Sequence, residues 1–251
     1  MLDYFFYFAL LATLLNDKMQ LPYFYEPSIT AGMKQFILSD DTARHAMQVL
    51  RMREGECLQL ADGKGLLLTA EIETADKKNC AVQIAAQKFI PQESKNICLA
   101  ISPTKNNARL EWLIEKVTEI GIRKIILLNC ERTEKTNIKM ERLHRISVAA
   151  MLQSEQAYLP ELAGMTAFDE IVSHNDYEEK LIAHCANDDN KMAVKNFSSD
   201  KSTIILIGPE GDFSNREIGA ARQRAFRSVT LGNTRLRTET AGMVAVTLLN
   251  I

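Results

Sequence analysis

Residues 204–214 read Ile-Ile-Leu-Ile-Gly-Pro-Glu-Gly-Asp-Phe-Ser, and residues 231–241 read Leu-Gly-Asn-Thr-Arg-Leu-Arg-Thr-Glu-Thr-Ala. Each stretch predicts an apolar strand that runs into a sharp turn and then a helix. Strands of an open α/β sheet expose main-chain N–H and C=O groups where they end, and small ligands bind there. One such turn is compatible with a simple tight connection. Two turns in consecutive units predict a shared pocket.

The composition is that of an ordinary globular protein. The 251 residues suffice for two modest domains or one large one. A hydrophobic fraction of 46% and a charged fraction of 25% exclude disordered and fibrous classes. The formal net charge of -2 gives no overall basic field. Contact with nucleic acid would therefore need a local basic patch.

Several catalytic and metal-binding motifs are missing from the sequence. The five cysteines are scattered without a Cys-x-x-Cys pair, which disfavours zinc ribbons and suits a reducing compartment. The sequence also lacks the dinucleotide, P-loop, nucleophile-elbow and His-Glu-x-x-His signatures. His184-Cys185 follows an apolar run, so we interpret it as a packed strand end. We expect no metal.

The N-terminus is apolar from Tyr4 to Leu15. This run is shorter than the about 20 residues that a membrane span needs, and no basic segment precedes it as in a secretory signal. We interpret residues 1–19 as an N-terminal extension, with a short helix packed on a neighbour as the alternative. We expect no membrane association.

Residues 20–90 predict a small β-barrel-like domain. Asp62-Gly63 lies between two apolar runs, which indicates a hairpin. The expected strands are 57–61, 66–72 and 80–85, and a short helix is expected within 40–50. Residues 91–96 are polar and contain a proline, which indicates a linker.

Residues 97–251 alternate between strand and helix patterns, which predicts a mostly parallel sheet covered on both faces. Gly121 suits the end of one helix, and Ser214-x-x-Glu217 suits the start of another as a capping box. The expected strands are 97–101, 125–128, 181–184, 203–207 and 229–231. The expected helices are 109–120, 138–158, 214–226 and 238–250.

Residues 235–240 allow two interpretations. In one, Thr238 or Thr240 caps the following helix and Arg235 is solvated. In the other, Arg237 lies beside a ligand, where a fixed guanidinium stabilises developing negative charge.

Taken together, the motif Ile207-Gly208-Pro209-Glu210-Gly211 and the motif Leu231-Gly232-x-x-x-Leu236-Arg237-Thr238-Glu239-Thr240-Ala241 resemble the bacterial 16S ribosomal RNA (uracil-N3)-methyltransferases. That family belongs to the SPOUT superfamily. Residues 23–90 resemble its PUA-like RNA-binding module, including His45 and residues 49–52. Residues 111–121 resemble the first helix of its catalytic domain.

The resemblance implies an α/β fold with a C-terminal SPOUT trefoil-knot domain, mostly parallel in its sheet, and an N-terminal PUA-like β-barrel domain. It implies S-adenosylmethionine as cofactor, 16S rRNA in the small ribosomal subunit as substrate, a homodimer formed through knot helices, and a cytoplasmic location. The cofactor-binding residues it implies are Ile207, Gly208, Pro209, Glu210, Gly211, Leu231, Gly232, Leu236, Arg237 and Thr238.

The resemblance also suggests catalytic and RNA-binding residues. Arg237 would stabilise the uracil anion, while Glu239, Glu210 or bulk water would accept the proton. The RNA-binding candidates are Arg44, His45, Arg51, Arg53 and Lys64; taken by themselves, these cations fit a solvated face.

The chain departs from the family at two places. Many relatives carry glycine where this chain has Asp212, which either narrows the turn or caps the next helix beside Ser214. Around residues 152–156, relatives often carry Glu-Gln followed by an arginine, whereas this chain has Leu152 and Gln156 in those places.

Two alternative functions stay open. One is another SPOUT activity, on a tRNA base or a ribose 2′-hydroxyl, and the other is a non-enzymatic ribosome assembly factor with a degenerate pocket.

Overall fold

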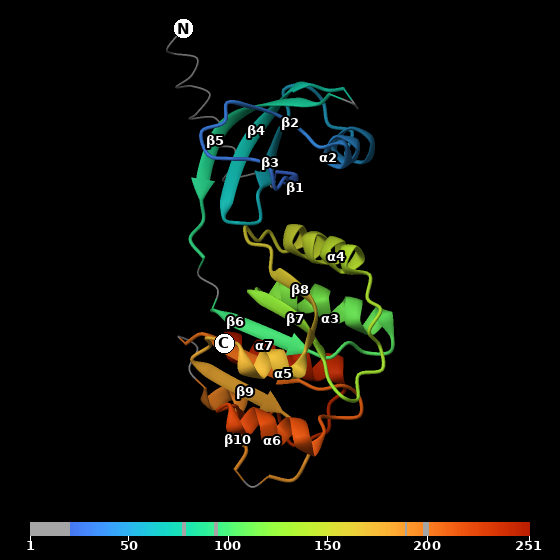
Figure 1. Ribbon diagram of the computed structural model, residues 1–251. Coiled ribbons are helices and arrows are strands. Elements are labelled where there is room, and N and C mark those ends of the chain that lie inside the picture. Colours follow the sequence, from blue (N-terminus) through green and yellow to red (C-terminus); the bar gives the residue numbers. More distant parts are fainter. Residues whose placement is uncertain (1–20, 77–78, 93–94, 189, 198–200) are drawn as a thin grey trace. The chain divides into compact units, whose positions relative to one another are not determined.

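A computed structural model describes residues 21–76, 79–92, 95–188, 190–197 and 201–251 (Figure 1). The chain divides into two compact units, one of residues 1–92 with 151–158 and one of residues 93–150 with 159–251. The expected N-terminal extension lies outside the described residues. The expected domain boundaries stay a prediction. The sequence analysis expected residues 151–158 in the C-terminal domain, whereas this division groups them with the first unit.

The first unit contains a five-stranded sheet in the order β1-β3-β4-β5-β2. Its strands are β1 (Tyr23–Tyr25), β2 (Gln35–Ile37), β3 (Cys57–Ala61), β4 (Leu66–Thr74) and β5 (Ala81–Phe89). β1 runs parallel to β3, and the other pairs are antiparallel. Leu66, Leu68, Ala70 and Ile72 of β4 are buried in alternation, as one covered face requires. The predicted hairpin at Asp62-Gly63 is confirmed.

The expected helix within 40–50 changes its winding halfway. It consists of α2 (Asp40–Arg44) and a π-helical turn, η1 (His45–Val49). The Ser39 side chain accepts a hydrogen bond from the N–H of Thr42 and so caps α2. Arg51 then takes a positive φ of 57° and ends the helical run.

The second unit is built on seven strands in the order β10-β12-β9-β11-β6-β7-β8, and each neighbouring pair is parallel. The strands are β6 (Ile97–Ile101), β7 (Lys124–Asn129), β8 (Glu161–Ala167), β9 (Glu179–Ala183), β10 (Met192–Ala193), β11 (Thr203–Ile207) and β12 (Arg227–Thr230). β6 and β11 are buried along their whole length, as expected for a sheet covered on both faces. The predicted α/β class is confirmed; the trefoil knot stays a prediction.

Helices cover this sheet on both sides. They are α3 (Asn107–Ile120), α4 (Met140–Gln153), α5 (Phe168–Ser173), η2 (Val194–Asn196), α6 (Asn215–Gln223) and α7 (Thr238–Asn250). α3 and α7 pack together on the face to which Leu99 and Ile101 belong. α5 and α6 contact each other on the face of Cys98 and Ala100. The side chains of β6 thus alternate between two apolar cores.

The sequence analysis differs from the structure of this unit in two respects. The helix expected to continue to Tyr158 ends at Gln153, because Glu155 adopts a left-handed φ of 54°. The sequence analysis also missed β8, β10 and the short helices α5 and η2. The sequence of β8, Glu-Leu-Ala-Gly-Met-Thr-Ala, does not alternate between apolar and polar residues, so it carries no clear strand signal. Its burial shows no period of two either.

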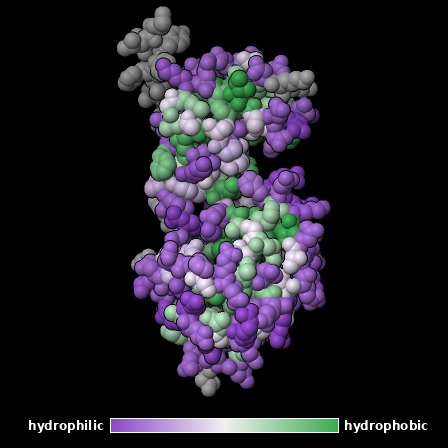
Figure 2. All heavy atoms as spheres, viewed as in Figure 1, coloured by the Kyte–Doolittle hydropathy of each residue, from purple (hydrophilic) through white to green (hydrophobic). Residues whose placement is uncertain are grey.

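Polar side chains cover most of the visible surface in Figure 2, and the large apolar residues lie mainly in the cores. Among the described residues, no helix combines the length and apolarity that crossing a membrane requires.

Candidate functional site

Three neighbouring strands of the second unit, β12, β9 and β11, end at the same edge of the sheet because they are parallel. Two adjoining cavities of about 430 and 410 Å³ lie where the chain leaves these strands. The first cavity lies beside the exit of β12 and the second beside the exit of β11. They share Ala183, Cys185, Arg235, Leu236 and Ala241. The two turns singled out in the sequence therefore line one continuous site.

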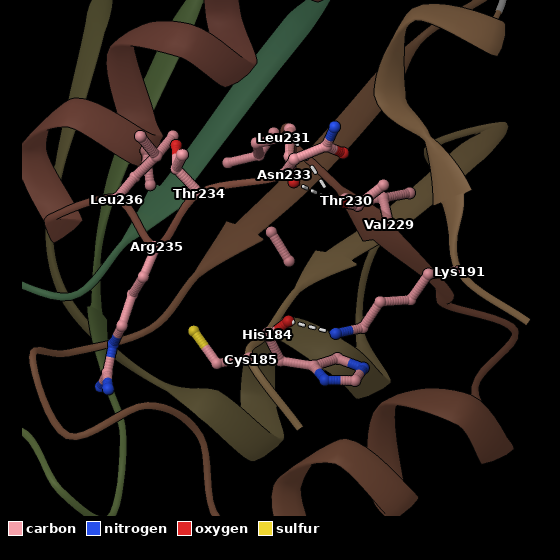
Figure 3. Close-up of a pocket in the computed structure, with 13 residues that line it drawn as sticks. His184, Cys185, Lys191, Val229, Thr230, Leu231, Asn233, Thr234, Arg235 and Leu236 are labelled. Carbon is pink, nitrogen blue, oxygen red and sulfur yellow. Dashed lines mark hydrogen bonds between the residues drawn. The ribbon is translucent and has the colours of Figure 1, made fainter. Parts of the chain in front are cut away.

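The first cavity is bounded by the turn after β12 (Figure 3). Gly232 has a φ of 147°, which favours glycine, and the Thr230 hydroxyl bridges the N–H and C=O of Gly232 at 3.3 and 2.9 Å. On the other side, the Lys191 ammonium donates to the carbonyl oxygens of His184 and Ala186 at 2.6 and 2.7 Å. Hydrogen bonds within the chain therefore hold the backbone on both sides of the first cavity in place.

The second cavity is bounded by the turn after β11. A Cβ at Gly208 would lie 3.1 Å from the Phe213 ring, so a larger residue would require the ring to shift by a few tenths of an ångström. Glu210 accepts a hydrogen bond from the N–H of Lys105 at 3.0 Å, and Arg132 donates to the carbonyl of Gly211 at 2.7 Å. Both interactions tie the turn to neighbouring loops.

Asp212 connects two strand ends and does not cap the following helix. Its carboxylate accepts hydrogen bonds from the N–H groups of Cys185 and Phe213, both at 2.8 Å. Its φ is 63°, a left-handed conformation in which glycine is favoured. The alternative in which Asp212 caps the helix beside Ser214 is therefore wrong, and Ser214 is the N-cap.

The predicted capping box of α6 is confirmed. The Ser214 hydroxyl accepts from the N–H of Glu217, and the Glu217 carboxylate accepts from the N–H of Ser214 at 2.8 Å. The same buried carboxylate accepts from the N–H of Glu131 at 2.9 Å. Glu217 therefore joins the start of α6 to the end of β7.

His184 is buried and lines the first cavity. Its Nε2 lies 3.0 Å from the Ser228 hydroxyl, and its Nδ1 has no hydrogen-bond partner within the described chain. Burial, and then the nearby Lys191 ammonium, lower the pKa of His184 below its ordinary value, so the ring is held neutral. Among the described residues, no three metal-ligating side chains cluster.

Nine of the ten residues expected at the cofactor site line these cavities. Ile207, Gly208, Pro209, Glu210, Arg237 and Thr238 line the second, Leu231 and Gly232 the first, and Leu236 both. Gly211 is in neither lining, although its carbonyl is held by Arg132. The structure thus brings the two motifs together.

Glu239 has a different position from the other candidates. It lines neither cavity, and its side chain is only 9% exposed. Its Oε1 lies 3.7 Å from Nε of Arg109, which does line the second cavity. The sequence analysis missed Arg109, Ala183 and Cys185 as lining residues. Ala183 and Cys185 could have been found if the strand expected to end at His184 had been paired in parallel with the strands before the two signature turns.

The basic candidates of the first unit lie on exposed backbone turns. Arg44, His45, Arg51 and Arg53 are exposed on α2, η1 and the residues that follow, and Lys64 is exposed in the β3–β4 hairpin. Arg44 forms an ion pair with Asp41, and the His45 ring packs edge-on against Phe24. RNA binding by these residues stays a prediction.

Comparison with known proteins assigns both units. A family model described as an RNA methyltransferase domain matches residues 91–250, and one described as an RNA methyltransferase PUA domain matches residues 38–85. The ribosomal RNA small subunit methyltransferase E of Rickettsia conorii is 27% identical over 212 residues, which are 84% of this chain and 86% of that protein.

Solved structures agree with this assignment. A structure from Porphyromonas gingivalis, described as a probable rRNA methyltransferase, is 39% identical, with a TM-score of 0.84 over 90% of this chain and 95% of that one. A methyltransferase structure from Legionella pneumophila with bound cofactor SAM is 30% identical, with a TM-score of 0.82 over 92% and 97%. The methyltransferase match over more than half of the sequence shows that this chain belongs to the RNA methyltransferase family that includes ribosomal RNA small subunit methyltransferase E, of the SPOUT superfamily.

Proposed function

We propose that this protein transfers the methyl group of S-adenosylmethionine to N3 of one uridine in 16S rRNA of the small ribosomal subunit. The observation that carries the proposal is the pair of adjoining cavities lined by both signature turns. Similar proteins support it, since the Legionella pneumophila structure contains SAM and the Rickettsia conorii relative is named for small-subunit rRNA.

The cavities suit this cofactor in size and lining. Each lies within the roughly 300–1,000 Å³ range of small-molecule sites. Apolar side chains such as Ile207, Leu231 and Leu236 would pack against the adenosine. Main-chain N–H and C=O groups at the strand ends would form hydrogen bonds with its polar atoms. When bound, the sulfonium supplies an activated methyl group, so the protein contributes chiefly alignment.

The acceptor nitrogen must lose its proton before or during attack. Arg237 lies at the second cavity with an exposed side chain, where its guanidinium would stabilise the negative charge on the ring oxygens. Glu210 already accepts the N–H of Lys105, and Glu239 is buried beside Arg109. Bulk water is therefore the proton acceptor that we favour among the three candidates.

Binding of S-adenosylmethionine, followed by methyl transfer, tests this function. Calorimetry should show one cofactor site, and labelled methyl should pass to small ribosomal subunits. Arg237→Ala should lower turnover by about 10²-fold, the typical effect of removing one stabilising donor. Arg224→Ala is the control, because Arg224 is exposed and lines neither cavity. No cofactor binding would favour an assembly factor, and transfer to tRNA or a ribose hydroxyl would favour another SPOUT activity.

A further inference from the structure

Arg109 belongs to neither signature turn, yet its side chain lines the second cavity from the first turn of α3. Its side chain is 41% exposed, and its Nε lies 3.7 Å from Oε1 of Glu239. The guanidinium therefore stands between the cavity and a buried carboxylate. Arginine carries five N–H donors in a planar fork, so an ion pair on the Nε side leaves the terminal amino groups for a ligand.

Glu239 is an unusual carboxylate. It is buried at the start of α7, and its Oε2 has no hydrogen-bond partner within the described chain. A buried carboxylate is costly unless a cation compensates its charge. Arg109 provides the ion pair that the structure shows for it. This arrangement suits a residue that holds an arginine better than one that exchanges protons with solvent.

The charges around the second cavity favour an anion. Arg109, Arg235 and Arg237 all line it. The two acidic residues in the lining are already engaged, since Glu210 accepts the N–H of Lys105 and Asp212 accepts those of Cys185 and Phe213. Guanidinium groups at this part of the site would attract the deprotonated ring of an acceptor base.

We propose that Arg109 binds the acceptor base next to the cofactor, at the part of the second cavity that Arg109 lines, and that Glu239 is its positioning residue. The inference rests on the proposed function. As N3 loses its proton to water, the negative charge spreads to the ring oxygens, where Arg109 donates N–H groups. The N3 electron pair then forms the bond to the methyl carbon, and the electrons of the breaking C–S bond pass to sulfur, which leaves a neutral thioether.

The test compares Arg109→Ala, Arg109→Lys, Glu239→Gln and the double variant Arg109→Ala/Glu239→Gln, with Arg224→Ala as the control. Turnover and KM are measured on small ribosomal subunits, cofactor affinity by calorimetry, and folding by thermal unfolding. Arg109→Ala should lower turnover by about 10²-fold while the Kd for cofactor changes less than about threefold. Arg109→Lys, or added guanidinium ion with Arg109→Ala, should restore part of the turnover.

The role of Glu239 follows from the double variant. Glu239→Gln should lower turnover by about tenfold, and the double variant should be no slower than Arg109→Ala, because Glu239 acts through Arg109. If Glu239→Gln fails to fold, the two Arg109 variants decide the inference.

Wild-type turnover in Arg109→Ala, or a loss of cofactor affinity as large as the loss of turnover, overturns the inference. An effect of Glu239→Gln that exceeds that of Arg109→Ala and multiplies with it would make Glu239 the proton acceptor. Failure of the proposed function is seen separately, in the wild-type protein, as a methyl group on another atom or none.

Discussion

Asp212 holds the turn after β11 in a left-handed conformation, and its carboxylate joins this turn to the end of β9. The resemblance indicated that this residue stands where many relatives carry glycine. It could not show that the position has a φ of 63°, which explains why glycine suits the position. Nor could it show the bond to Cys185, which is 27 residues away.

Two substitutions at Asp212 separate the effect of its strained backbone from the effect of its two hydrogen bonds. Asp212→Ala keeps the strained φ and loses both hydrogen bonds, so we expect it to lower the free energy of unfolding by about 2 kcal/mol. Asp212→Gly loses the same bonds but relieves the strain, so it should be about 1 kcal/mol more stable than the alanine variant. Urea denaturation measures both. Equal stability of the two variants would contradict a strained backbone.

His184 should make stability depend on pH. Its pKa is lowered in the folded protein by burial and by Lys191, below the ordinary value of 6.5. As the pH falls below that value, the unfolded chain binds a proton that the folded ring resists, so stability decreases. Wild type should therefore lose more stability between about pH 8 and about pH 5 than His184→Gln does.

The exposed His174 gives a matched control for this measurement. His174→Gln removes an exposed imidazole and is measured under the same conditions. An unchanged dependence in His184→Gln would show that this ring does not resist protonation.

At the scale of elements, the start of α6 was predictable and its anchor was not. Ser214 and Glu217 are three residues apart, so local sequence reveals the capping box. The bond from Glu217 to the N–H of Glu131 spans 86 residues and depends on the tertiary fold. Similarly, β8 was missed because its burial has no strand period, and Glu155 ended α4 through its backbone conformation.

Glu217 should be among the most sensitive positions of this unit. Its buried carboxylate accepts hydrogen bonds from two main-chain N–H groups, one of which completes the cap. Glu217→Ala leaves these donors buried without partners, so we expect a loss of about 3 kcal/mol in the free energy of unfolding. Glu217→Gln retains one oxygen acceptor and should lose less. Chemical denaturation checks this, and a change below about 0.5 kcal/mol for the alanine variant would contradict the anchoring role.

At the scale of the whole molecule, three strands of the first sheet and five of the second were expected, because the Asp62-Gly63 hairpin and the strand–helix alternation are local patterns. Which strands become neighbours is a long-range property, so β9, and Cys185 two residues after it, were not expected beside the two signature turns. The homodimer also stays a prediction, which light scattering of the purified protein would test.

Substitutions in the first unit should weaken RNA binding without changing cofactor binding. Among the described residues, those that line the two cavities all belong to the second unit. Replacing Arg44, Arg51 and Arg53 with glutamine should weaken binding to small ribosomal subunits. It should also reduce the slope of log affinity against log salt by roughly 0.7–0.9 for each phosphate that the variant no longer neutralises. Cofactor affinity should not change.

The exposed residue Lys34 precedes β2 and provides the control. Replacing it with glutamine should leave the salt slope near that of wild type. Equal losses in the two variants would show a diffuse charge effect in place of a binding surface.

The most direct test is the identity of the methylated nucleoside. Small ribosomal subunits from a strain that lacks its own enzyme would be incubated with this protein and S-adenosylmethionine, and their 16S rRNA digested and mapped by mass spectrometry. We predict one new 3-methyluridine at a single position. A methyl group on a ribose, on another base or only on tRNA, or no methyl group at all, would contradict the proposed function.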